Sequence, residues 1–267
     1  MVKIVLPIFT FYVTATSATP EALEKAPSLI WMGVLVAFLN FGLATAFFTL
    51  AAVSPEQQRT FRFGAILPNT AFIGYPICLA LLGPLGLFYA VVHDFGSALI
   101  VWTFGIWDLS GGRAANWRSL MLNPLIWSVI AGVIWAALGL PMPAWAGAPL
   151  DTLGDATVPL ALLVAGAQMG RSHVRSNSWL RQLLGMGALR LIAAPLVTAL
   201  VVIGLGWRNE MGQVIVLLNA MPAGLTVAIM ARTYGADARF GAQATLWTTI
   251  ASLATLPAVA WLVLNRL

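Results

Sequence analysis

The sequence predicts an all-α polytopic membrane protein, built as one unit of packed transmembrane helices. Of its 267 residues, 60% are hydrophobic and 9% are charged, whereas soluble domains carry roughly 25% charged residues. So few charges cannot cover a water-facing surface. The apolar runs are also long and continuous, rather than alternating as in a membrane β-barrel. Because the connections are short, we treat residues 1–267 as a single membrane unit.

Charge and cysteine content exclude several kinds of site. The net charge of +5 would suggest acidic partners in a soluble protein, but here a bias between loops accounts for it, and we expect no nucleic-acid partner. Cys78 is the single cysteine, and His93 and His173 are the only histidines. One thiol permits no intramolecular disulfide and no cysteine metal cluster. We therefore expect no metal site and no cofactor.

The apolar runs define the predicted membrane spans. A spanning helix needs about 20 apolar residues, and on this measure the first run is short while the second is long enough to tilt. The sequence predicts nine segments, at roughly 3–18, 28–53, 63–82, 85–107, 123–140, 152–169, 183–205, 213–234 and 242–264.

The basic residues predict the orientation. Under strict alternation of nine spans, ten lysines and arginines fall on the side of the N-terminus and three on the other side. Because cytoplasmic loops are enriched in Lys and Arg, the N-terminus is predicted to be cytoplasmic and the C-terminus outside. The ten are Lys3, Arg59, Arg62, Arg113, Arg118, Arg171, Arg175, Arg181, Arg232 and Arg239, and the three are Lys25, Arg208 and Arg266.

Two apolar runs are interrupted by residues that a lipid-facing helix does not use. Each proline removes a backbone donor, and in hydrocarbon the freed carbonyl groups cannot bond to water. Two interrupted segments, one in each half of the chain, point to the binding site of a transporter. The interrupting residues are Pro68, Asn69, Gly74 and Pro76 in the first run, and Asn219, Pro222 and Gly224 in the second.

The two halves of the chain also correspond to each other. The fifth predicted segment, which starts at Asn123, has no partner in the first half. The pattern predicts two inverted five-helix repeats, of which the first lacks its first helix, and an odd number of spans per repeat places the copies in opposite orientations. The matched residues are Pro7 with Pro159, Asn69 with Asn219, and Pro76 with Pro222.

The breaks predict an anion site. The N-terminus of a half-helix presents unpaired amide donors and a partial positive charge, which suit an anion and most simply a carboxylate. Alternatively, the prolines only kink packed helices and the asparagines bond between helices. The candidate substrate-binding residues at the breaks are Asn69, Thr70, Pro76, Asn219, Pro222 and Gly224.

Ionisable residues within the spans supply further candidates. His93 and Asp94 are candidates for proton coupling or for a structural polar contact, and adjacent residues of a helix point about 100° apart. Arg190 either neutralises an anionic substrate or snorkels to the interface. We assign no catalytic residue. Asn40, Gln168, Thr226 and Thr248 either line the site or pack helices.

Several motifs, in this order and spacing, resemble the auxin efflux carrier family, which includes plant auxin carriers and bacterial organic-acid permeases. The first is Asn69-Thr70-Ala71-Phe72-Ile73-Gly74-Tyr75-Pro76, which matches the family pattern N-T-x-F-x-G-x-P. The resemblance covers nearly the whole chain. The other motifs lie at 123–126, 153–162, 190–195 and 220–224, with Ala231, Tyr234 and Gly235 behind the last.

The resemblance implies a ten-helix fold of two inverted repeats, in which two broken helices cross. Here these would be the third and eighth segments. It also implies a scaffold part, about 1–20 and 120–170, and a transport part, about 28–107 and 180–264. A homodimer through the scaffold and a bacterial-type plasma (inner) membrane are further expectations. The predicted absence of the first helix bears on the expected scaffold surface and on the expected homodimer, and not on the crossover.

The combined prediction is a secondary transporter of small organic anions, of which a carboxylate is the simplest. We expect it to work by an elevator-type movement with the anion bound at the crossover. H+ is the first candidate for a coupling ion. A sodium-coupled bile-acid-type symporter is the alternative within transport. An intramembrane enzyme that uses His93 and Asp94 would form product without a gradient. A non-transporting membrane sensor would bind a ligand without flux.

Overall fold

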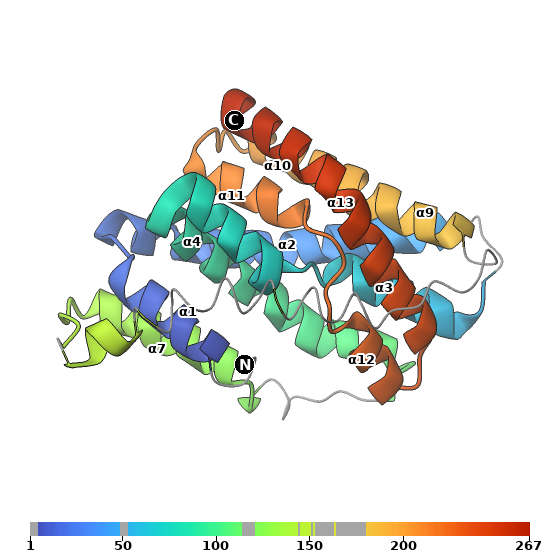
Figure 1. Cartoon of the computed structure of the whole chain (residues 1–267), viewed down its shortest axis with the longest axis horizontal. Helices are drawn as coiled ribbons and strands as arrows, with labels where there is room; N and C mark the ends of the chain where they lie inside the picture. The colour runs from blue at the N-terminus through green and yellow to red at the C-terminus, as the bar shows by residue number, and fades with distance from the viewer. Residues whose placement is uncertain are drawn as a thin grey trace.

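The computed structural model describes residues 5–48, 53–113, 121–143, 145–150, 152, 163 and 180–267, and their regular structure is helical (Figure 1). The first half contains α1 (Val5–Thr16), α2 (Pro20–Phe48), α3 (Pro55–Ile66), the π-helical turn η1 (Thr70–Gly74), α4 (Tyr75–Ile100), the π-helical turn η2 (Val101–Gly105) and α5 (Ile106–Leu109). The second contains α7 (Pro124–Ala137), α9 (Leu180–Ala188), the π-helical turn η4 (Leu189–Ala193), α10 (Ala194–Gly204), α11 (Glu210–Asn219), α12 (Val227–Thr233) and α13 (Ala238–Arg266).

The described helices confirm an α-helical membrane protein with several spans. Two shorter apolar helices, α1 and α7, accompany the long ones. The predicted sixth segment, 152–169, lies outside the described residues apart from Thr152 and Leu163, so the number of spans stays a prediction. Helices long and apolar enough to cross a membrane cover Pro20–Phe47, Thr70–Leu109, Leu180–Gly204 and Ala238–Arg266.

The second helix begins earlier than the sequence predicted. Helix α2 starts at Pro20 instead of residue 28 and includes Pro27 in its interior. The added turns carry Glu21 and Lys25, which form an ion pair of 2.6 Å one turn apart. A count of apolar residues misses such turns, because a helix can continue into the polar interface after its apolar run has ended.

The third predicted segment also begins earlier, at Pro55 rather than residue 63. Ser54 caps helix α3 by accepting a hydrogen bond from the Gln57 backbone N–H at 3.3 Å, and a proline at the first helical position is typical of a helix start. Arg62 therefore lies on a helix and not in a loop. Its guanidinium makes two hydrogen bonds to Asp108 of α5, at 2.9 and 2.8 Å.

Residues 70–109 form two helical arms joined by a sharp bend where the third and fourth predicted segments meet. The arms lie side by side, since Thr70 and Tyr75 of the first arm both hydrogen-bond to Asp94 of the second. At the bend Gly83 has φ 69° and ψ −166°, a conformation that is easily reached only by glycine. Pro84 follows directly and cannot donate a backbone hydrogen bond. The chain therefore reverses direction within α4 at the predicted boundary between residues 82 and 85.

Two helix pairs organise the packing. Helix α1 lies along α7 on one side of the molecule, and α2 packs along α4 in its middle (Figure 1). Two glycines bring α2 and α4 close together: a Cβ on Gly33 would clash with the His93 carbonyl oxygen, and one on Gly96 would clash with the Ile30 carbonyl oxygen. Such small residues let helix backbones touch in a membrane protein.

Candidate functional site

The two helix breaks bond directly to each other. The Asn69 backbone N–H donates to the Pro222 carbonyl at 2.8 Å, and the Gly224 N–H donates to the Leu67 carbonyl at 2.7 Å. Pro68 and Ala223 form an antiparallel bridge between them. Backbone groups that neither half-helix can satisfy therefore bond to the other break, which is how non-helical backbone becomes tolerable at membrane depth.

A widened turn follows the first break because of Pro76. The Asn69 carbonyl accepts hydrogen bonds from the backbone N–H groups of both Ile73 and Gly74, each at 3.2 Å. Pro76 lacks an N–H and removes the next regular bond, and a π-helical turn accommodates this loss. The same arrangement recurs where the π-helical turn η4 precedes Pro195.

Threonines of α13 and a glycine fix the second break. The Ala223 N–H donates to Thr248 Oγ1 at 3.1 Å, and Thr245 Oγ1 donates to the Gly224 carbonyl at 3.1 Å. A Cβ on Gly224 would lie 3.0 Å from both the Leu67 Cγ and the Leu67 carbonyl oxygen. The two breaks can approach this closely because residue 224 has no side chain.

Asn219, the last residue of α11, is held by the protein on both sides of its amide. Its Nδ2 donates to the Ile215 carbonyl at 2.9 Å, and its Oδ1 accepts from Asn40 Nδ2 of α2 at 3.2 Å. Both asparagine side chains are buried. The interpretation of Asn40 as a helix-packing residue agrees with this contact.

Asn69 is equally buried, but its side-chain donor is free. Its exposed fraction is 2%, and Nδ2 has no hydrogen-bond partner. Although Asn69 precedes a helix, its side chain makes no capping bond. The first backbone N–H groups of that helix, at residues 70–72, have no acceptor within the helix itself. Free donors therefore gather at the first break, next to the positive end of the helical arm that runs from Thr70 to the bend at Gly83.

Arg190 is fully buried and joins the two half-helices that enter the breaks. Its exposed fraction is 0%, so the alternative that it snorkels to the interface is wrong. Nη1 donates to the Ala65 carbonyl at 3.0 Å and Nη2 to the Met221 carbonyl at 2.7 Å, while Nε has no partner. These carbonyls lie at the C-terminal ends of α3 and α11, where a cation is favourable.

Asp94 faces the start of the helix that follows the first break. Its Oδ2 accepts from Thr70 Oγ1 and from the Tyr75 hydroxyl, each at 2.9 Å. Tyr75 was not a candidate in the sequence, although it stands inside the first motif. A cavity of about 10 Å³ adjoins Asp94, which is the order of size that holds one water molecule.

The cavity beside Asp94 has an apolar wall. Leu125, Ile126 and Val129 of α7 form this wall opposite Tyr75 and Asp94 of α4. His93 has a different environment: it is 2% exposed, and neither ring nitrogen has a hydrogen-bond partner. The two adjacent residues therefore do not act as one pair.

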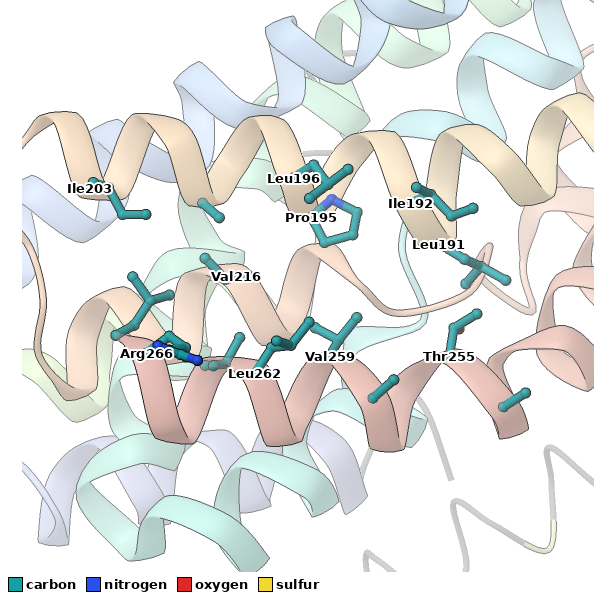
Figure 2. A pocket seen from close by; sticks show the side chains of 15 residues that line it. Leu191, Ile192, Pro195, Leu196, Ile203, Val216, Thr255, Val259, Leu262 and Arg266 are labelled. Atoms are coloured by element: carbon teal, nitrogen blue, oxygen red, sulfur yellow. The ribbon is translucent and has the colours of Figure 1, made fainter.

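A cavity of about 450 Å³ lies away from the breaks, between α10 and α13 (Figure 2). Another, of about 520 Å³, lies beside α1 and α7. Neither is lined by any candidate residue of the breaks. The site is therefore marked by buried polar groups rather than by the volume of a cavity.

Comparison with known proteins finds transporters. The family model described as "Membrane transport protein" matches residues 112–260, more than half of the chain. An "Uncharacterized transporter" of Methanothermobacter thermautotrophicus is 29% identical over 196 residues, which cover 72% of this chain and 64% of that protein.

Plant relatives match a shorter part of the chain. A "Probable auxin efflux carrier component 1b" of Oryza sativa is 29% identical over 125 residues, covering 44% of this chain and 22% of that protein. "Auxin efflux carrier component 3" of Arabidopsis thaliana is 26% identical over 130 residues, covering 44% and 19%. The chain thus spans under two thirds of the length of each of these three relatives.

Proposed function

We propose that this chain, which belongs to the membrane transport protein family together with the auxin efflux carriers, carries small organic anions across the membrane. It is a transporter and not an enzyme. The anion class, the position of the substrate, the mechanism and the coupling ion are the proposed parts. The proposed substrate is a carboxylate, bound beside the two helix breaks.

The observation that carries this proposal is the free amide of Asn69. A buried donor without a partner costs roughly 1–3 kcal/mol, and a structural asparagine would have been expected to find one. Nδ2 of Asn69 is such a donor, and it stands before the N-terminus of the helical arm that begins at Thr70. A carboxylate oxygen would accept this hydrogen bond, and the positive end of the helix would favour its charge.

The hydrogen bonds between the breaks support movement of the break region as one body. Helices α3 and α11 are tied together by the backbone bonds of the breaks and by Arg190. Helices α1 and α7 form a separate pair that meets α4. We infer an elevator-type motion of the transport part, about 28–107 and 180–264, against a scaffold part, about 1–20 and 120–170, which also forms the homodimer.

Asp94 is the proposed proton carrier. Its carboxyl group faces Leu125, Ile126 and Val129 of α7, and an ionised carboxylate is expensive to slide along an apolar wall. Protonation would remove that charge during the movement. We therefore infer symport of the anion with H+ rather than Na+, with the N-terminus in the cytoplasm and the C-terminus outside a bacterial-type inner membrane.

Uptake into proteoliposomes tests the proposal. Labelled malonate, malate and indole-3-acetate would be offered with a pH gradient and, separately, with a sodium gradient. We expect saturable uptake that depends on the pH gradient and is lost in Asn69→Ala. The matched control is Asn265→Ala, because Asn265 is exposed and its amide donates to the Trp261 carbonyl of its own helix.

Three outcomes would contradict parts of the proposal. Uptake that is unchanged in Asn69→Ala would place the anion elsewhere. Dependence on sodium alone, or an unaltered pH dependence in Asp94→Asn, would remove Asp94 as the proton carrier. Ligand binding without flux would favour a membrane sensor.

A further inference from the structure

A long apolar groove runs between α10 and α13, with α11 as its floor. Its volume is about 450 Å³, and side chains from the two helices face each other across it (Figure 2). The groove opens at the surface, since Ile192 of η4, Leu196 of α10 and Leu262 of α13 are about half exposed. Val216 of α11 lies at its base.

The dimensions of the groove suit a hydrocarbon chain. On α13 its lining extends from Ala254 to Leu267, which at about 1.5 Å per residue is a length on the order of 20 Å. One leaflet of a bilayer has a hydrocarbon layer of about 15 Å. A chain that enters from one membrane surface would therefore fill the groove along its length.

One end of the groove carries a positive charge. Arg266 carries the one charged side chain among the lining residues and stands at the end opposite Leu191 and Ile192 (Figure 2). The side chain is exposed, and Arg266 takes part in none of the ion pairs between the described residues. An apolar groove that ends at a free guanidinium matches a ligand with an acyl chain and an anionic headgroup.

We propose that this groove binds an anionic phospholipid, with one acyl chain between α10 and α13 and the phosphate at Arg266. A neutral lipid would fill the groove without a partner for the guanidinium. A bound chain would also contact the helix that enters the second break, because Val216 lies three residues before Asn219 on α11. The bound lipid therefore stabilises the packing of α11 through Val216.

Lipid titration of the full chain in an uncharged detergent tests this site. Phosphatidylglycerol would be added and followed by thermal unfolding and by native mass spectrometry. Phosphatidylcholine with the same chains tests the headgroup charge, and glycerol 1-phosphate tests the headgroup without a chain. We expect one retained phosphatidylglycerol and a rise in the unfolding temperature, a smaller rise with phosphatidylcholine, and none with glycerol 1-phosphate.

Two variants distinguish the contribution of the Arg266 charge to lipid binding from that of the apolar groove. Arg266→Gln should weaken phosphatidylglycerol binding about fivefold, the order expected for one basic residue at a lipid headgroup. Ala258→Trp should block binding of both lipids, because Ala258 lines the groove. The controls are Arg208→Gln and Leu253→Trp, which change exposed residues outside the groove and should bind as the wild type does.

Several results would overturn the proposal. Equal stabilisation by phosphatidylcholine would mean that Arg266 selects no headgroup. An equal effect of glycerol 1-phosphate would mean that the chain does not enter the groove. Binding that survives in both variants would place the lipid elsewhere. If either variant instead abolished a dimer formed without added lipid, the groove would hold a second copy of the protein.

Discussion

The two helix breaks share a residue pattern, but the protein holds them differently. At the second break the side chain of Asn219 bonds to Asn40 and to its own helix, and α13 binds the backbone through Thr245 and Thr248. At the first break the amide of Asn69 has no partner. The comparison indicates that the second break supports the site, while the first offers it a free donor.

Removing Arg190 should have the largest effect on stability, because its guanidinium binds a backbone carbonyl next to each of the two breaks. Arg190→Met leaves the carbonyls of Ala65 and Met221 buried without their donors. Since a hydrogen bond to a charged group contributes about 1.5–3 kcal/mol, we expect a loss of about 3 kcal/mol or more in the free energy of unfolding. Unfolding in SDS of the detergent-solubilised protein measures it.

The control for this prediction is Arg181→Met, because Arg181 is exposed at the start of α9. A stability of Arg190→Met equal to that of this control would show that the breaks do not depend on the guanidinium.

A substitution that disturbs the close approach of the two breaks should give the next largest loss of stability. Gly224→Ala places a Cβ at 3.0 Å from the Leu67 carbonyl oxygen, which cannot move without disturbing the backbone bonds. We expect a loss of about 1–3 kcal/mol, as for other overpacked sites. Gly204→Ala is the control, because a Cβ there meets nothing within 4 Å. Equal unfolding curves for the two variants would rule out this steric effect.

The bond between Asn40 and Asn219 should contribute less. A double-mutant cycle of Asn40→Ala and Asn219→Ala should give a coupling energy of about 0.6 kcal/mol and at most about 1.7, the range found for hydrogen bonds between membrane helices. SDS unfolding of the wild type, both single variants and the double variant measures it. Purely additive losses would mean that the contact at 3.2 Å does not stabilise the second break.

The smallest effect on stability is expected at Asn69. Asn69→Ala removes a donor that has no internal partner and so relieves the cost of burying it, while the lost packing of the buried side chain opposes this gain. The unfolding free energy should therefore change by less than about 1 kcal/mol. Uptake should nevertheless be lost, whereas Asn219→Ala should lose both stability and uptake. If Asn69→Ala were as unstable as Asn219→Ala, the two breaks would have equivalent roles and the comparison above would fail.

Much of the architecture followed from the sequence. Prolines and asparagines within apolar runs predicted the positions of both breaks, and the low fraction of charged residues predicted a membrane protein. Both predictions were possible because neither feature depends on which residues contact each other in the fold. Helix starts were wrong at α2 and α3. There the chain continues as a helix into polar residues such as Glu21 and Gln57, which a count of apolar residues cannot include.

The tertiary structure alone decided which polar groups are satisfied. The sequence presents Asn69 and Asn219 as equivalents, and it cannot tell that Asn40 reaches one of them from α2. It left open whether Arg190 meets an anion or the interface, and the fold buries it away from the interface with its Nη atoms bonded to two carbonyls. Hydrogen bonds between residues distant in the chain depend on how helices pack, so only the folded arrangement distinguishes a free donor from a bound one.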